Sequence, residues 1–475
     1  MSSGAYCRIE ISCLEGRAQS VRFRQKLFHS LYNALKSSAS ALREAIAADS
    51  GNGEAEVALE LALALSELRT HYDTLNLEEE LKEQRSLENL NATTNIGIIY
   101  VIPAKQNLYY SVISALTAAL AAGNCVIVEL PPTLTQVSGL LRKILPSALD
   151  ADVFTISSTR PSETFLSKCR VLAQTDEDQA TSSPSQLSAK VVAVVDRTAN
   201  VSEAASVVST SRVSFNGRSA YAPDIVLVNE FVADDFLFHL VQAITSPMST
   251  TSPTASQARS KTQPDPQSPT MKEVENTEGL RIIMSGANGS IVEVRDRTKV
   301  ALGRRIAGRV IMVCRITSLD DAIDLCNGFG TPLEASYAFA APTEANYLAR
   351  FIDARISCVN HIPTELLIGP FAPKHPTIAP SPSPRYPSTL FRSPRPRLAQ
   401  ASNLTEICRE IIRSRSTKSL ESWARATMEP PLPAIKQADG RATGFFDQAL
   451  MVIGGTAVSV LAGSAYILFR VLRKR

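Results

Sequence analysis

From residue 96 onward the chain alternates short apolar runs with helical segments, and this alternation limits the fold more than any other feature. The run IGIIYVI stops at Pro103, an apolar helical segment follows and stops at Gly123, and the run CVIVEL stops at Pro131. Runs rich in β-branched residues and bounded by Pro or Gly are typical of buried strands. Similar runs recur at 153–156, 170–173, 190–195, 224–228, 291–294, 310–316, 336–341 and 356–360. Strands that alternate with helices predict an α/β fold whose sheet is mostly parallel and carries helices on both faces.

Two helices are expected ahead of this alternation, at residues 16–48 and 54–75, with their charged faces in solvent. The chain has 475 residues, of which 44% are hydrophobic, so it is long enough for two or more domains. A formal net charge of +3, without a basic stripe, gives no indication of nucleic-acid binding. The eight cysteines form no Cys-x-x-Cys pair, and the five histidines have no metal-ligand spacing. We therefore expect reduced thiols in a protein that faces the cytosol, and no metal site.

An uncharged stretch begins at Ala449 and ends at Phe469, and six residues, four of them basic, close the chain. Its 21 residues are long enough to cross a hydrocarbon core of about 30 Å. A buried core helix is the alternative, but the position next to a basic end favours a tail anchor with residues 1–448 in the cytosol. Gly455, Ser459 and Gly463 recur every four residues and would let two such helices pack closely.

Two segments have compositions that do not suit a packed core. Residues 246–268 are rich in Ser, Thr and Pro and predict a disordered insertion. Prolines crowd residues 363–397, which we expect to be mobile. A basic helix at 405–427 and a linker up to residue 448 are expected to follow.

The stretch VSFNGRSAYAPDIVLV at residues 213–228 joins a turn-forming Asn-Gly to an apolar strand. It resembles the nucleophile segment of aldehyde dehydrogenases, and especially the class 3 and fatty aldehyde dehydrogenase branch. Gly217 and the Ala-Pro-Asp at 222–224 match that segment. Ala220 stands where the family carries its cysteine.

Other segments extend the resemblance over roughly residues 16–362. They lie at 102–107, 115–128, 190–196 and 305–310. The resemblance implies an aldehyde dehydrogenase-like α/β fold, in which residues 1–187 form N-terminal helices and a degenerate Rossmann-type cofactor-like domain. Residues 188–362 would form the catalytic-like domain, followed by the Pro-rich segment, basic helix and linker at 363–448 and the transmembrane helix at 449–469.

The catalytic positions that the resemblance identifies carry unsuitable side chains. The methyl group of Ala220 cannot attack a carbonyl as a thiolate does. Gln186 lies 34 residues earlier, at the family's interval between its general-base glutamate and its cysteine, and its amide cannot take a proton from water. Lys105 stands where the family has a neutral amide donor for the oxyanion.

The cofactor positions have also changed. The Gly-rich phosphate turn corresponds to the segment that begins at Gln174, which has no glycine and contains three acidic residues. Glu129 stands where the family has a lysine for the adenosine ribose. Arg305 and Ala307 stand where it has a glutamate and a phenylalanine near the nicotinamide. We therefore expect no intact catalytic or cofactor site, and no bound NAD or NADP.

These features predict a membrane-anchored, aldehyde dehydrogenase-like pseudoenzyme that acts by binding or regulation. The alternative is an NAD(P)-dependent oxidoreductase that converts a lipophilic aldehyde to its carboxylic acid, because fatty aldehyde dehydrogenases carry a comparable C-terminal span. Expected partners are the membrane and either a second copy of the chain or an active paralogue, but no nucleic acid. By analogy with the fatty aldehyde branch, the endoplasmic reticulum is favoured over the peroxisome and the mitochondrial outer membrane.

Overall fold

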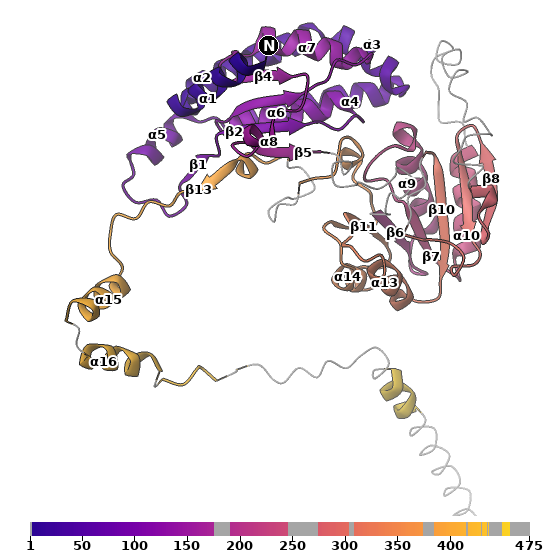
Figure 1. The fold of residues 1–475 in the computed structure, drawn as a ribbon. Coiled ribbons are helices and arrows are strands. Elements are labelled where there is room, and N and C mark those ends of the chain that lie inside the picture. The colour runs from indigo at the N-terminus through magenta and orange to yellow at the C-terminus, as the bar shows by residue number, and fades with distance from the viewer. Residues whose placement is uncertain are drawn as a thin grey trace, which may run out of the picture. The chain divides into compact units, whose positions relative to one another are not determined.

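The fold comes from a computed structural model that divides the chain into two compact units, Met1–Leu398 and Ala399–Arg475 (Figure 1). The residues whose structure is described are 2–174, 191–245, 274–303, 308–373, 384–414, 417–428, 430–434, 436 and 449–456. Residues 246–268, for which the sequence predicts a disordered insertion, lie outside these ranges.

The first unit begins with five helices, of which α1 contacts the first sheet and α2, α3 and α4 pack on the helices α6 and α7 that cover it. Their bounds are α1 Ser2–Glu15, α2 Val21–Ser37, α3 Ala39–Ser50, α4 Glu54–Asp73 and α5 Leu77–Arg85. The continuous helix expected at 16–48 is two helices, because the chain turns at Ser38. The expectation that the charged side chains of α4 are solvated is wrong for Glu60 and His71, which are 1% and 2% exposed.

A four-stranded parallel sheet follows, in the order β4-β3-β2-β5. Its strands are β2 Ile98–Ile102, β3 Cys125–Glu129, β4 Phe154–Ser157 and β5 Arg170–Ala173. Helix α6, Leu108–Ala121, packs on β2 and β3 and is covered by α4, while α7, Gln136–Ala148, packs on β4. Beside this sheet β1, Thr93–Asn95, pairs antiparallel with β13, Arg392–Pro394. This pairing joins the C-terminal end of the first unit to the segment that follows α5.

The second sheet has seven strands in the order β12-β11-β6-β7-β10-β9-β8. All neighbours pair in parallel except β8 and β9, so the expectation of a mostly parallel sheet is confirmed. The strands are β6 Val191–Val195, β7 Ile225–Asn229, β8 Leu280–Gly286, β9 Gly289–Val294, β10 Val310–Ile316, β11 Ala335–Phe339 and β12 Ser357–Val359.

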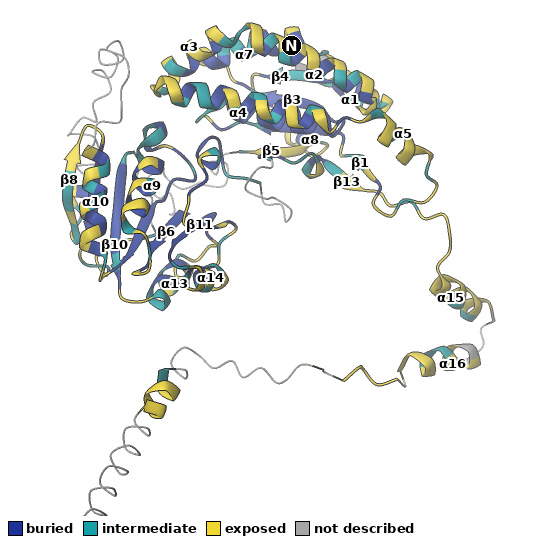
Figure 2. Ribbon diagram, turned by 180° about the vertical axis from the view of Figure 1, so that it is seen from behind, coloured by how far each residue is buried: buried dark blue, intermediate teal, exposed yellow. Residues whose placement is uncertain are grey.

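Alternate residues of β6 separate the two faces of this sheet. Val191 and Val195 belong to the same apolar cluster as Ala204 of α9, Val201–Val213. Val194 belongs to the cluster on the other face. Helix α10, Ala233–Thr245, lies with α9, and helices α13, Leu319–Asn327, and α14, Pro342–Phe351, cover the opposite face. Figure 2 shows the inner strands buried, the edge strand β8 more exposed, and the outer helix faces exposed. Helices on both faces are confirmed by these contacts.

The second unit contains two short helices in place of the single basic helix expected at 405–427. They are α15, Asn403–Ser414, and α16, Thr417–Met428. Of the predicted membrane span, residues 449–456 are described and are helical. Within the described residues, no helix has both the length and the apolar character needed to cross a bilayer.

Candidate functional site

The loop that precedes Ala220 has an unusual backbone. It is a short 3-10 turn, Ser214–Gly217, between α9 and β7. Phe215, Asn216 and Gly217 all have positive φ, at 51°, 57° and 67°. A bulky residue rarely adopts this conformation, so contacts around the loop must hold it there. A Cβ atom on Gly217 would lie 2.3 Å from the carbonyl of Gly308, so only glycine fits at that position.

Contacts from the N-terminal helices hold the loop in this shape. The backbone N–H of Phe215 donates to the Glu56 carboxylate at 2.8 Å. The Asn216 amide donates to the carbonyl oxygen of Ser50 at 3.1 Å and to Asn52 Oδ1 at 3.0 Å. These hydrogen bonds therefore hold the Asn-Gly turn, which the sequence predicts, against the N-terminal helices, at the point where the chain enters the second sheet.

Ala220 lies in the segment that leads from this joint into β7. Its methyl group is half-buried, between the buried residues Ser219 and Tyr221. The carbonyl of Tyr221 accepts from the Tyr337 hydroxyl at 2.9 Å. The Tyr221 hydroxyl accepts from the backbone N–H of Ala372 at 2.8 Å. The backbone at the family's nucleophile position is thus well fixed, but Ala220 offers no atom that could react.

The Asp of the Ala-Pro-Asp motif closes the loop on the sheet. Asp224 Oδ2 accepts from the backbone N–H of Val191 at 3.1 Å. Its other carboxylate oxygen lies 3.8 Å from the guanidinium of Arg212, and both side chains are fully buried. The Arg212 Nε–H donates to the carbonyl of Val310 at 2.9 Å. A buried charge pair with added hydrogen bonds to the backbone is the arrangement that low-dielectric surroundings tolerate. Asp224 therefore positions the loop.

A buried arginine from the Pro-rich segment packs beside Tyr221. Arg385 is 5% exposed, and its guanidinium carbon lies 5.2 Å from the centre of the Tyr221 ring. The guanidinium donates to four backbone carbonyls, those of Pro370 at 2.7 Å, Ile368 at 2.8 Å, Glu365 at 3.2 Å and Leu366 at 3.4 Å. The expectation that residues 363–397 are mobile is therefore wrong for the described parts, 363–373 and 384–397. Proline fixes φ and has no backbone N–H to donate, and in this segment the Arg385 side chain supplies donors to the backbone carbonyls.

The same arginine meets α4 through its backbone. The N–H of Arg385 donates to Glu67 Oε1 at 2.9 Å, and the Tyr110 hydroxyl donates to the same oxygen. Burial raises the pKa of Glu67, while the bonds from Tyr110 and Arg385 act in the opposite direction. Sequence reasoning missed this cluster, because a single Arg among prolines carries no pattern that indicates burial.

Of the other predicted catalytic positions, only Lys105 lies within the described residues. It is exposed in the turn between β2 and α6. Gln186 lies in the segment 175–190, and Arg305 and Ala307 lie in 304–307, all outside the described residues.

The carboxyl ends of the first sheet form the edge at which a dinucleotide binds in folds of this kind. Glu129 ends β3 there, and its Oε2 accepts from the Tyr100 hydroxyl at 2.7 Å. Gln174 follows β5 and uses its side chain internally, because Oε1 accepts from the Ala104 N–H at 3.0 Å and Nε2 donates to the Ser111 carbonyl at 2.8 Å. The described residues here offer a carboxylate and an engaged amide, which do not fit a diphosphate.

An N-terminal helix reaches the same edge. The Tyr6 hydroxyl of α1 lies 2.7 Å from Ser157 Oγ, at the end of β4. The Tyr6 ring stacks on Phe165 with 4.7 Å between ring centres. Helix α1 thus adds its own side chains at the end of β4.

Comparisons with known proteins agree with this architecture. The search found no protein-family model that matches the chain. Rat aldehyde dehydrogenase family 3 member B1 is 24% identical over 369 residues, which cover 68% of this chain and 75% of the rat protein.

Solved structures with the same fold include the following two. A substrate-bound Staphylococcus aureus AldH superposes with a TM-score of 0.64 at 17% identity, covering 85% of this chain and 95% of that one. Gox0499, in a structure described as giving insight into its cofactor and substrate selection, superposes with a TM-score of 0.62 at 17% identity, covering 84% and 94%.

Proposed function

Because the chain is a member of the aldehyde dehydrogenase superfamily, we propose that it is a membrane-anchored pseudoenzyme that uses this fold for binding. The observation that carries the proposal is Ala220. The strained turn at Ser214–Gly217 and the hydrogen bonds of Tyr221 fix the backbone at the family's nucleophile position. The side chain at that position is only a methyl group. Oxidation of an aldehyde by this family needs a covalent thiolate adduct.

The edge of the first sheet supports the same proposal. Glu129 puts a carboxylate where the family has a lysine for the adenosine ribose, and Gln174, at the start of the phosphate turn, is engaged in bonds to its own chain. We propose that the chain holds neither NAD nor NADP. A second copy of the chain or an active paralogue is the proposed partner, and the apolar stretch at 449–469 is the proposed anchor, in the endoplasmic reticulum rather than in the peroxisome or the mitochondrial outer membrane.

A second candidate is oxidation of a lipophilic aldehyde with NAD or NADP. The observation that favours it is the similarity to curated proteins that are named aldehyde dehydrogenases. Under this candidate a residue outside the described ranges supplies the base, and another side chain replaces the missing thiol.

Calorimetry separates the two candidates. The full chain, purified in a mild non-ionic detergent, is titrated with NAD and with NADP, and an active aldehyde dehydrogenase serves as the positive control. The pseudoenzyme proposal predicts no binding heat from either cofactor and no formation of reduced cofactor with long-chain aldehydes. Saturable cofactor binding together with turnover would establish the second candidate.

A further inference from the structure

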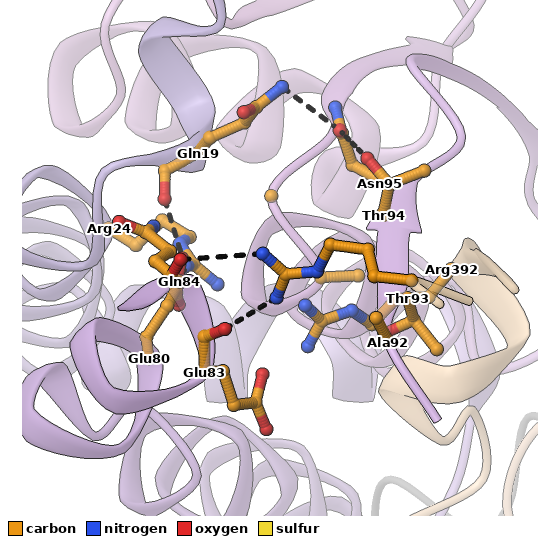
Figure 3. Close-up of a pocket in the computed structure, with 13 residues that line it drawn as sticks. Gln19, Arg24, Glu80, Glu83, Gln84, Ala92, Thr93, Thr94, Asn95 and Arg392 are labelled. Carbon is orange, nitrogen blue, oxygen red and sulfur yellow. Dashed lines mark hydrogen bonds and ion pairs between the residues drawn. The ribbon is translucent and has the colours of Figure 1, made fainter. Parts of the chain in front are cut away.

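A polar pocket of about 130 Å³ lies on the first unit, away from the Ala220 loop. It lies where α2, α5, β1, β13 and the end of α6 meet (Figure 3). A cavity of roughly 150 Å³ is large enough for benzene, so this pocket has room for a ligand of about five heavy atoms. The side chains that carry the argument are Arg24, Arg392, Arg397, Glu80 and Asn95.

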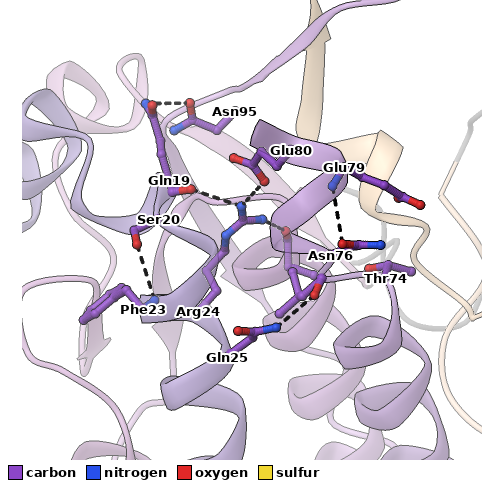
Figure 4. A network of polar contacts seen from close by, with 12 residues as sticks. Gln19, Ser20, Phe23, Arg24, Gln25, Thr74, Asn76, Glu79, Glu80 and Asn95 are labelled. Carbon is purple, nitrogen blue, oxygen red and sulfur yellow. Dashed lines mark hydrogen bonds and ion pairs between the residues drawn. The ribbon is translucent and has the colours of Figure 1, made fainter. Parts of the chain in front are cut away.

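Arg24 lines the pocket and is buried, and Figure 4 shows the polar contacts around it. Its guanidinium donates to the carbonyls of Ala121 and Gln19 and to Glu80 Oε2, the last at 2.7 Å. Its Nε atom is buried without a hydrogen-bond partner. Burial lowers the pKa of Arg24, and the nearby positive charge of Arg392 lowers it further, although Glu80 opposes both. Three guanidinium groups, those of Arg24, Arg392 and Arg397, therefore line the pocket, and Glu80 is the carboxylate that contacts Arg24.

The two arginines near the C-terminal end of the unit differ in how they are used. Arg397 donates to the backbone carbonyls of Glu83 and Gln84, near the end of α5. Arg392 has a buried Nε without a hydrogen-bond partner. Among the described residues, no carboxylate lies within 4.0 Å of the Arg392 guanidinium. Glu83 also lines the pocket, but its side chain is exposed to solvent. The Arg392 guanidinium therefore has N–H donors that no carboxylate of the described residues contacts.

Strand β1 adds neutral donors on the facing side. Asn95 Oδ1 accepts from Gln19 Nε2 at 3.1 Å and from Thr94 Oγ1 at 3.3 Å. With its oxygen engaged in this way, the Asn95 side chain has its amide nitrogen left as a donor. Thr93 also lines the pocket and carries a hydroxyl. Donors therefore come from β1, β13 and α2, three separate directions.

We propose that this pocket binds a phosphate group, either free inorganic phosphate or the terminal phosphate of a small phosphomonoester. A guanidinium fork matches phosphate oxygens in pairs, and charge-assisted bonds of this kind are the strong ones. A tetrahedral oxyanion accepts from several directions, as the donors here require. It would also compensate the excess positive charge between Arg24 and Arg392. The bound group would join β1 to β13, and so the segment after α5 to the C-terminal end of the first unit.

Equilibrium dialysis of the full chain in detergent tests the proposal, with inorganic phosphate as the probe and chloride added to match ionic strength. We expect saturable binding of one equivalent. The variant Arg392→Gln should weaken binding at least about tenfold, because it removes a charge-assisted donor. Arg395→Gln is the matched control, since Arg395 is exposed one residue beyond β13 and the variant changes net charge equally. Its affinity should stay within about twofold of the unmodified chain.

Further arms identify the ligand and guard against misfolding. Arg392→Lys keeps the charge but loses the fork, so it should fold and bind phosphate more weakly. Glycerol phosphate binding more tightly than inorganic phosphate would assign the site to a phosphomonoester, and the reverse order to free phosphate. The absence of saturable phosphate binding at about 10 mM, equal affinity in Arg392→Gln and the unmodified chain, or equal competition by acetate would each overturn the proposal.

Discussion

The guanidinium carbon of Arg385 lies 5.2 Å from the centre of the Tyr221 ring, and Tyr221 is the residue next to Ala220. An arginine from the Pro-rich segment thus packs against the loop that corresponds to the family's nucleophile segment. The side chain also donates to four backbone carbonyls. This part of the fold depends on one side chain that the sequence pattern does not reveal.

We predict that Arg385→Gln lowers the free energy of unfolding by about 2–4 kcal/mol. The variant removes the buried charge and leaves the carbonyls of Pro370 and Ile368 without their donors. Urea denaturation of the full chain, followed by circular dichroism, measures the change. Arg395→Gln, an exposed control, should shift it by less than about 0.5 kcal/mol. A loss in Arg385→Gln no larger than in the control would show that the buried guanidinium contributes nothing.

We predict that restoring the family's reactive groups does not restore activity. In Ala220→Cys combined with Gln186→Glu, a thiol and a carboxylate return, but Glu129 and Gln174 still present a carboxylate and an engaged amide, which we propose do not hold a diphosphate. Absorbance of the reduced nicotinamide, measured with long-chain aldehydes, should stay at the level of a heat-treated sample. Turnover in this double variant would refute the argument about the cofactor edge.

The stability of the chain should depend on pH through Glu60. Burial raises the pKa of Glu60 from 4.5 to about 7, although the Tyr110 N–H and the Asn107 side chain act in the opposite direction. The folded state therefore holds this proton more tightly than the unfolded state. The resulting stability is fully present below pH 4.5 and is lost as the pH rises towards 7, a difference of about 3 kcal/mol.

Glu60→Gln removes this dependence. We expect its free energy of unfolding, measured by urea denaturation, to fall by about 3 kcal/mol more than that of the unmodified chain when the pH is lowered from about 7.5 to 4.5. Glu78→Gln, on exposed α5, is the control and should follow the unmodified chain. Parallel pH profiles for Glu60→Gln and the unmodified chain would contradict the prediction.

Through His71 the free energy of unfolding should change with pH in the opposite direction. Burial lowers its pKa from 6.5 to about 4, so the folded state favours the neutral ring. Its contribution to stability is fully present above pH 6.5 and is lost as the pH falls towards 4. When the pH is lowered from 7.5 to 4, the free energy of unfolding of His71→Gln should therefore fall by about 3 kcal/mol less than that of the unmodified chain. The exposed His29→Gln serves as the control, and identical acid sensitivity in His71→Gln and the unmodified chain would exclude the effect.

We predict that the C-terminal stretch determines fractionation. Deleting residues 449–475 should move the protein from the membrane pellet to the supernatant of a cell lysate. The double variant Val458→Arg, Leu461→Arg keeps the length of the stretch but places two charges at its centre. It should also move the protein to the supernatant, because each charge at a bilayer centre costs about 3 kcal/mol. Gly455→Leu keeps the stretch apolar and should leave the protein in the pellet. Pelleting of the double arginine variant would argue against a membrane anchor.

The strands of both sheets could be predicted from the sequence because buried parallel strands are continuous apolar runs. Val191–Val195 and Ile225–Asn229 were visible for this reason, as was the helix between them. Strand β8 was missed because it is the antiparallel edge, and it is only partly buried. Helix α1 lacks a clear apolar stripe, and its burial at Ile9 comes from tertiary packing.

The candidate site was only partly accessible to sequence reasoning. The turn at Gly217 and the position of Ala220 in the loop before β7 follow from a local sequence pattern, so they could be predicted. The contacts of Arg385 and Glu67 could not, because they join distant segments and each residue, taken alone, is typical of a solvated surface. The same reason hid the polar pocket, because its lining residues come from distant parts of the chain.

Glu67 and Arg385 are 318 positions apart, so their contact can form only late in synthesis. At about 5–20 residues per second, roughly 15–60 s pass between the appearance of these two residues on the ribosome. During that interval helix α4 carries a carboxylate whose final partner has not yet been made. A nascent chain that stops before residue 384 also lacks β13 and so cannot pair β1. The first unit therefore completes its core only when its last residues emerge, so truncated products should be substrates for chaperones and proteases.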